Sequence, residues 1–133
     1  MKSEVRLPPS RTSGPMSVEE AIFRRRSVRE FKTGVLDIDE LAAIVWAAQG
    51  TTALGGYRTA ASAGALYPIE LYVLVGDVPA VPAGLYHYKT LSHTLSPVSS
   101  HDYRRQVAKT CLDQTWISAA PVVLVFAAAY ERT

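Results

Sequence analysis

The chain has 133 residues, a mass of 14.5 kDa, 48% hydrophobic residues, 20% charged residues and a net charge of +2, which fit one globular domain and exclude a disordered or collagen-like chain. The longest apolar run, residues 121–130, is too short for the roughly 20 residues of a membrane-spanning helix, and the polar N-terminus, with Pro8 and Pro9, lacks the apolar core of a signal peptide. We therefore expect a cytoplasmic protein with no membrane partner.

The first segments in the chain are predicted to be a tail and a short helix. Residues 1–15 contain two prolines and no apolar period, which predicts a flexible N-terminal tail before a domain over 16–133. Ser17 and Glu20 have the spacing of a capping box, so a helix should begin there and end near Arg25 or Arg26. One face of this helix is expected to hold Val18, Ala21, Ile22 and the stem of Arg25.

A second helix is predicted from Asp37, the expected N-cap, with Glu40 in the reciprocal position. Apolar residues follow helical spacing over 41–48, and Gly50 suits a left-handed C-terminal cap. Because Trp46 makes this helix apolar nearly all round, we expect it to be covered on more than one side.

The rest of the chain alternates between strand and helix patterns. Residues 69–75 and 122–128 are predicted to be the central strands, and the second of these reads as buried on both faces. The elements between them are a hairpin with arms at 85–89 and 94–98, and a helix over 100–112 with Tyr103, Val107 and Cys111 inward. The pattern predicts an α+β fold with helices packed on a sheet.

A basic segment, residues 24–31, ends the first helix. Eight of the 14 Lys and Arg residues lie between Lys2 and Lys32 with four Glu, a local charge of +4. Guanidinium groups and a serine hydroxyl suit a phosphate ester. A solvated basic helix end is an equally simple interpretation, and nucleic acid is disfavoured because no basic or aromatic stripe continues the patch. The candidate ligands are Arg25, Arg26, Ser27 and Arg29.

A loop rich in small residues, 58–68, precedes the first central strand. Small side chains let a ligand approach the backbone closely, and Tyr67 could stack on a flat ring. The alternative is a tight loop that only feeds the strand. No metal site is expected, because Cys111 is the single cysteine and is expected to be buried and inert, and the three histidines lack zinc spacing.

Together these segments resemble the FMN-dependent nitroreductase family. The resemblance covers residues 16–133 and consists of RRSVREF, then SAGALYPIELYVLV, the GLYHY hairpin and the WISAAPVVLV strand. It is nearest to the branch of SagB-type and thiazole/oxazole dehydrogenases, although Ala61 stands where that branch usually has proline. It implies a flavoprotein with a mostly antiparallel sheet, an intertwined homodimer and FMN at the subunit interface.

The resemblance also implies roles for individual residues. Arg25, Arg26, Ser27 and Arg29 would bind the FMN phosphate and ring edge, with Arg29 near the pyrimidine edge. Ser62, Ala63, Gly64, Ala65 and Leu66 would reach the flavin from the other subunit, with Tyr67 and Pro68 fixing the turn. No catalytic proton donor is assigned.

Family members continue past the 122–128 strand into a long helix, another strand and a basic segment. The chain therefore resembles the N-terminal half to two-thirds of such a domain, and we expect the remainder to be a separate chain, a removed part or never encoded. The implied function is electron transfer between NAD(P)H and a small oxidised acceptor such as a nitroaromatic or quinone. The alternatives are an azoline dehydrogenase of peptide natural-product tailoring and a non-catalytic flavin-binding remnant.

Overall fold

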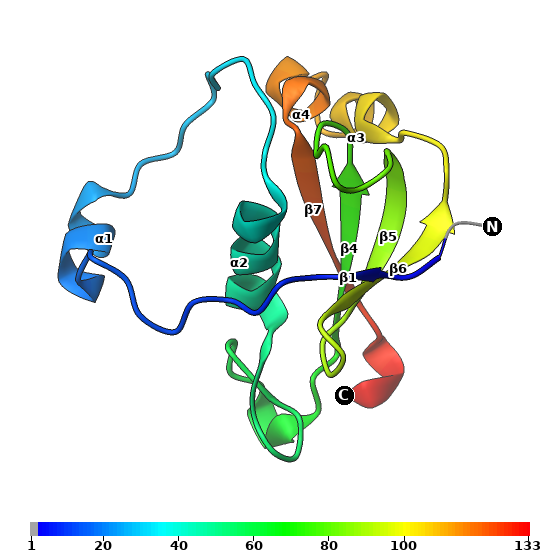
Figure 1. Cartoon of the computed structure of the whole chain (residues 1–133). Helices are drawn as coiled ribbons and strands as arrows, with labels where there is room; N and C mark the ends of the chain where they lie inside the picture. The colour runs from blue at the N-terminus through cyan, green and yellow to red at the C-terminus, as the bar shows by residue number, and fades with distance from the viewer. Residues whose placement is uncertain (1–2) are drawn as a thin grey trace.

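The computed structural model describes residues 3–133, which form a five-stranded sheet with helices at its face and ends (Figure 1). The elements in chain order are β1 (Val5–Arg6), α1 (Val18–Arg24), α2 (Ile38–Gln49), β2 (Thr51–Ala53), β3 (Tyr57–Arg58), the 3₁₀ turn η1 (Ala63–Ala65), β4 (Ile69–Val75), β5 (Gly84–Lys89), β6 (Thr94–Ser99), α3 (Arg104–Thr110), α4 (Thr115–Ala119), β7 (Val122–Ala128) and the 3₁₀ turn η2 (Tyr130–Arg132).

The main sheet has the strand order β1-β6-β5-β4-β7, and every neighbouring pair is antiparallel. The predicted α+β fold with a mostly antiparallel sheet is confirmed. Strand β4 is central, because it pairs along its whole length with β7 and over Tyr72–Val75 with β5. Strands β2 and β3 form a separate hairpin.

Helix α2 packs on one face of this sheet and forms the core with it. The predicted capping box is present: the Glu40 amide donates to the Asp37 carboxylate at 2.8 Å, and the Asp37 amide donates to the Glu40 carboxylate at 3.0 Å. Leu41 and Val45 are fully buried. They belong to one apolar cluster with Leu71, Val73, Val75, Tyr86, Tyr88 and Leu95 of the sheet.

The predicted C-terminal cap of α2 is wrong in its geometry. Gly50 caps the helix, but its φ of −68° is not left-handed. Glycine is needed there for a different reason, since any side chain at this position would collide with the Trp46 ring. Trp46 is half-buried, and Ile44 of the same helix is 42% exposed, so α2 is covered on one side rather than all round.

The opposite face of the sheet is only partly covered. Helix α3 lies at one end of it, and an apolar groove of about 330 Å³ remains between α3 and the strands. Strand β7 contributes to this groove through Val125, and Phe126 on its other face is 55% exposed. The prediction that β7 is a central strand buried on both faces is therefore wrong, because among the described residues β7 is an edge strand that pairs only with β4.

The N-terminal residues are attached to the sheet. Val5 and Arg6 pair with Leu95 and Thr94 of β6, and the amide of the buried Leu7 donates to the His93 carbonyl at 3.1 Å. The predicted tail is wrong for these residues, because two residues are enough to add a strand when an edge offers unpaired backbone groups.

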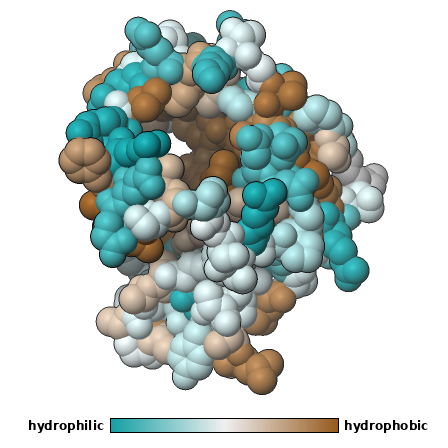
Figure 2. Space-filling view, turned by 60° about the vertical axis from the view of Figure 1, so that its left-hand side comes forward, coloured by the Kyte–Doolittle hydropathy of each residue, from teal (hydrophilic) through white to brown (hydrophobic). Residues whose placement is uncertain are grey.

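Helix α1 begins at its predicted N-cap, where the Ser17 hydroxyl accepts the Glu20 amide at 3.1 Å. The predicted inward face has no cover, because Val18 and Ile22 on it are 71% and 70% exposed, and the neighbouring Phe23 is 79% exposed. Figure 1 shows α1 on an arm that stands away from the sheet, and Figure 2 shows an opening between this arm and the body. The apolar side of α1 is thus available to another chain.

Helix α3 spans Arg104–Thr110 and is shorter than the predicted 100–112, because a side-chain hydrogen bond marks its start and a left-handed backbone turn follows its end. The Asp102 carboxylate accepts the Arg104 amide at 3.1 Å where the helix starts. Leu112 and Asp113 have φ values of 61° and 55°, which turn the chain toward α4. Cys111 follows the last turn and is exposed, so the prediction of a buried thiol is wrong.

Within residues 3–133, none of the helices combines the length and the apolar character that crossing a membrane requires.

The packing of α2 predicts that substitutions at its buried positions lower the free energy of unfolding much more than substitutions at its exposed positions. Leu41→Ala should lower the free energy of unfolding by about 2–5 kcal/mol, because the leucine is fully buried and leaves a cavity. Ile44→Ala on the same helix should cost less than about 1 kcal/mol. Urea unfolding followed by circular dichroism measures both. Equal effects would show that the α2 face is assigned wrongly.

Candidate functional site

The basic segment lies on the arm just after α1. The side chains of Arg25, Ser27 and Arg29 are exposed and have no hydrogen-bond or ion-pair partner within residues 3–133. Arg26 differs, because its Nη1 donates to the Phe23 carbonyl at 3.0 Å and to the Arg25 carbonyl at 2.7 Å. Three side chains are therefore free to bind an anion, while Arg26 is held against the local backbone and shapes the turn.

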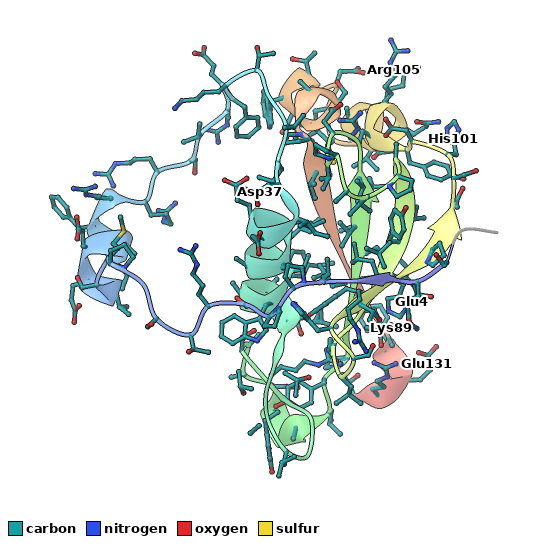
Figure 3. The ribbon with its side chains drawn as sticks, in the orientation of Figure 1. Glu4, Asp37, Lys89, His101, Arg105 and Glu131 are labelled. Carbon is teal, nitrogen blue, oxygen red and sulfur yellow. The ribbon has the colours of Figure 1, made fainter. Side chains whose placement is uncertain are left out.

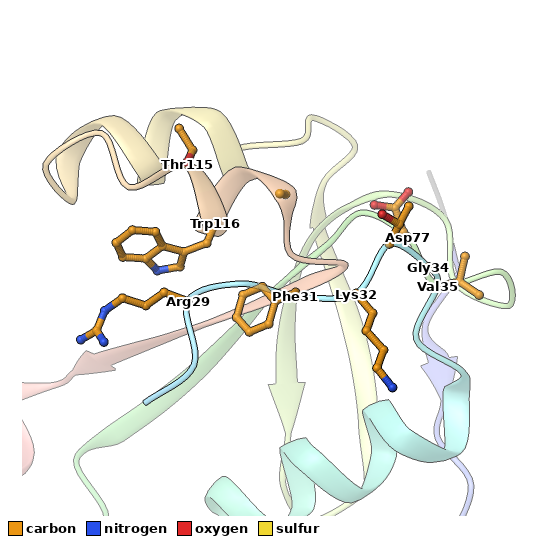
Figure 4. Close-up of a pocket in the computed structure, with 10 residues that line it drawn as sticks. Arg29, Phe31, Lys32, Gly34, Val35, Asp77, Thr115 and Trp116 are labelled. Atoms are coloured by element: carbon orange, nitrogen blue, oxygen red, sulfur yellow. The ribbon is translucent and has the colours of Figure 1, made fainter. Parts of the chain in front are cut away.

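Arg29 also lines a pocket of about 610 Å³ between the arm and α4 (Figure 4). Phe31 and Lys32 come from the arm, and Trp116 comes from α4. The Asp77 carboxylate also lines the pocket, but it is paired with Arg104 at 3.0 Å. The two aromatic rings and the two cations can therefore accommodate a planar, negatively charged group. Trp116 was not a sequence-predicted site residue, and its place in the WISAAPVVLV segment gave no sign that it would face Arg29.

The loop 62–67 has an unusual backbone. Gly64, Ala65 and Tyr67 have φ values of 63°, 53° and 45°. A non-glycine residue in the left-handed region costs roughly 1–3 kcal/mol, so surrounding contacts must hold the loop in this shape. The Ser62 hydroxyl accepts the Tyr67 amide at 2.9 Å, and the Ser62 carbonyl accepts the Ala65 amide at 3.0 Å. Residues 63–66 on the outward side are exposed, and the small residues 63–65 present backbone there, whereas the Leu66 side chain is 51% exposed.

Tyr67 is engaged inside the chain. Its hydroxyl accepts the Arg58 amide at 3.2 Å, and the Arg58 guanidinium lies 4.9 Å from the centre of its ring. Arg58 also donates to the buried Gln49 at 3.1 Å and to the Ile69 carbonyl at 2.7 Å. Tyr67 therefore belongs to the framework of the loop. Nothing in the local sequence around Arg58 indicated this bracing role.

A charged cluster adjoins this loop on the sheet face opposite α2. Glu70 of β4 lies with one carboxylate oxygen 2.6 Å from His87 Nε2 of β5, and Arg132 of η2 pairs with its other oxygen. The His87 ring stacks on Tyr72 at 4.8 Å. Lys89 Nζ, which can only donate, lies 3.0 Å from His87 Nδ1, so the ring proton is on Nε2 and faces Glu70.

This cluster shifts the pKa of Glu70. Burial raises the pKa, but the hydrogen bonds from His87 and Arg132 outweigh burial, and the pKa is lowered from its ordinary value of 4.5. The cluster was not predicted from the sequence. Its one signal was that Glu70 is the only charged residue in an otherwise apolar strand.

The two predicted groups of site residues do not meet within one chain. The basic segment follows α1 on the arm, whereas the 62–67 loop lies at the far end of the molecule below α2 in Figure 1. The pocket beside the loop is lined by Ala60–Ala63 and Tyr67–Ile69 with Gln49, and it shares no residue with the Arg29 pocket. Residues 3–133 contain no group of three or more His, Cys, Asp or Glu side chains that could hold a metal ion.

Comparison with known proteins gives a consistent match. The model of the nitroreductase family matches residues 22–133. A nitroreductase homologue from Methanocaldococcus jannaschii is 41% identical over 118 residues, which are 89% of this chain and 60% of that protein. The chain thus spans less than two-thirds of the length of this curated relative.

Solved structures show the same fold. The crystal structure of a nitroreductase homologue from Ralstonia eutropha is 33% identical with a TM-score of 0.78, and the match covers 98% of this chain and 58% of that one. The Escherichia coli microcin synthetase McbBCD complex with truncated pro-MccB17 bound contains a chain that is 23% identical with a TM-score of 0.60, covering 98% and 53%. The second likeness concerns the fold alone.

The charged cluster makes stability depend on pH in a defined direction. Because the pKa of Glu70 is lower in the folded chain, its ionised form stabilises the fold above pH 4.5, and this contribution is lost as the pH falls through the lowered pKa. Glu70→Gln should therefore lose less stability than the wild type between pH 5 and about pH 3. Urea midpoints across that range measure this. The exposed Glu131→Gln should behave like the wild type, and an unchanged profile for Glu70→Gln would disprove the assignment.

Proposed function

Because the chain belongs to the nitroreductase family, we propose that it is the FMN-binding part of an oxidoreductase that moves electrons between NAD(P)H and a small oxidised acceptor such as a nitroaromatic or quinone. The observation that carries this proposal is the set of unpartnered donors Arg25, Ser27 and Arg29. They precede the left-handed 62–67 loop in the order that the family motif requires.

The residues present fit FMN. A phosphate monoester needs charge-assisted donors that are not already used, and Arg25 and Ser27 supply these. Arg29 and the aromatic rings in its pocket suit a flat ring system with a negatively polarised edge. The chain has no G-x-G-x-x-G turn after a strand, the usual cradle of a dinucleotide pyrophosphate, which favours FMN over FAD.

FMN, when bound, supplies the hydride and electron chemistry. The residues of this chain would bind and orient it. Arg25 and Ser27 would hold the phosphate, and Arg29 would place a fixed positive charge at the pyrimidine edge. The exposed backbone of residues 63–66 would approach the ring, because no large side chain stands in the way before Leu66.

A complete site requires a second chain, since the phosphate donors and the ring-contacting loop are far apart in one copy. We therefore propose a homodimer in which each copy supplies one half of each site. The exposed apolar side of α1 is the surface that the partner would cover. A separate chain corresponding to the rest of the relatives' length is the alternative partner, and NAD(P)H as electron donor belongs to the same proposal.

A second candidate function is azoline oxidation in peptide natural-product tailoring, as in SagB-type dehydrogenases. The segments SAGALYPIELYVLV and GLYHY support it, because they resemble that branch. Turnover of azoline peptides without reduction of nitroaromatics would select this function. A protein that binds flavin but turns over neither substrate would be a non-catalytic flavin-binding remnant.

The phosphate assignment predicts a specific loss of flavin. Arg25→Ala and Ser27→Ala should each weaken FMN binding by about 1–3 kcal/mol, or roughly 5- to 150-fold, with an unchanged circular dichroism spectrum, because both side chains are exposed. Flavin fluorescence titration measures this, and Arg105→Ala is the control for loss of one exposed arginine. Variants that bind FMN like the wild type would contradict the assignment, and recovery of FAD from the purified protein would contradict the choice of cofactor.

The dimer proposal predicts that a charge on α1 separates the copies. Phe23→Asp should convert a dimer into monomers and reduce flavin content, because Phe23 is 79% exposed on the proposed interface. Leu112→Asp, at an 86% exposed position on another part of the surface, is the matched control and should stay dimeric. Light scattering gives the mass. A monomeric wild type that binds FMN would rule out the shared site.

A further inference from the structure

We propose that Arg132 and Glu70 are positioning residues that hold the 62–67 loop in the shape needed to contact the flavin. This inference rests on the proposed function for its purpose, and on the contacts of the chain itself for its geometry. Glu70 lies within the SAGALYPIELYVLV segment but is given no role by the family resemblance, and Arg132 lies outside the segments that carry it. Neither residue is placed in contact with the flavin.

The link between Arg132 and the loop is direct. Arg132 Nη1 donates to the Tyr67 carbonyl at 3.1 Å and also pairs with the Glu70 carboxylate. One nitrogen thus joins the end of the loop to the second residue of β4. The backbone supports this arrangement, since the Ala129 amide donates to the Pro68 carbonyl at 2.8 Å and brings η2 against the start of the strand.

The Glu70 side chain is held in one position by contacts on both of its carboxylate oxygens. Its side chain is 22% exposed, and the oxygen that does not face Arg132 is 2.6 Å from His87 Nε2. His87 is itself held by stacking on Tyr72 and by Lys89. The Glu70 carboxylate is thus held in place by its own strand, β4, and by His87 of β5. Because Arg132 pairs with this carboxylate, the position of the Arg132 guanidinium is set by the sheet.

The loop needs this support at Tyr67 in particular. Tyr67 has a φ of 45°, which is uncommon for a tyrosine. Its amide is held by Ser62 and its ring by Arg58, so Arg132 supplies the hydrogen bond to the remaining polar group, the carbonyl. Without that bond the peptide after Tyr67 can rotate toward a commoner conformation, which moves the exposed backbone of residues 63–66.

Hydrogen exchange on the flavin-free protein tests the positioning directly. Arg132→Met keeps the length of the side chain but removes its donors, and it should speed exchange of the Ala65 and Tyr67 amides at least about fivefold, with Val45 in α2 unchanged. Arg132→Lys should restore most of the protection. The control is Arg105→Met, which removes an exposed arginine at the opposite end of the sheet from Glu131 of η2 (Figure 3). Unchanged exchange at Ala65 and Tyr67 would overturn the proposal.

A double-mutant cycle tests whether Glu70 acts through Arg132. Glu70→Gln should give a smaller increase in exchange at Tyr67, and combining it with Arg132→Met should add nothing, because both changes break the same link. Additive effects would show that the two residues act separately. If Arg132→Met fails to fold, Glu70→Gln and Arg132→Lys decide the question with the same measurement.

Flavin binding then tests the purpose of the contact. Arg132→Met should raise the Kd for FMN about tenfold and alter the visible circular dichroism of the bound flavin at saturation, a signal that a general loss of stability does not move. Unaltered binding and spectrum in a variant with a loosened loop would overturn the flavin role. If the wild type binds no FMN, the proposed function fails, whereas the exchange data still decide whether Arg132 and Glu70 hold the loop.

Discussion

The alternation of side chains along β4 is the constraint on which the rest of the structure depends. Successive residues of a strand point to opposite faces, so Leu71, Val73 and Val75 pack against α2 while Glu70 and Tyr72 lie on the other side. Because β4 pairs with strands on both edges, its two faces are fixed together. A shift of one residue would expose the core and bury Glu70 without His87 or Arg132.

The two halves of the candidate site are held by different kinds of interaction. Within the 62–67 loop the Ser62 hydroxyl accepts the Tyr67 amide. Arg58 and Arg132 connect the loop to the rest of the chain, because Arg58 donates to Gln49 of α2 and Arg132 pairs with Glu70 of β4. The arm that carries Arg25 and Ser27 has exposed apolar side chains and no such bracing among the described residues. The loop is therefore held by contacts within the chain, whereas the arm exposes apolar side chains that the proposed dimer would bury.

Local sequence signals predicted the elements whose stability is local. The capping residues Ser17 and Asp37 were identified correctly because a cap involves only residues three positions apart. Strand β4 and the β5–β6 hairpin were predicted from apolar and alternating patterns. Burial was harder to predict: β7 is as apolar as a central strand but lies at an edge, and Cys111 has helical spacing but follows the end of α3.

The sequence by itself determined the family, the order of the elements and the types of residue offered to a ligand, because these follow from local spacing and from motif order. Only the tertiary structure showed that Arg25 and the 62–67 loop lie apart, that Trp116 faces Arg29, and that Glu70 connects His87 to Arg132. The relations at Trp116 and Glu70 bring together residues that are 17 to 87 positions apart in the chain. Strand pairing and packing alone decide which of them meet, and no pattern within a short segment records that.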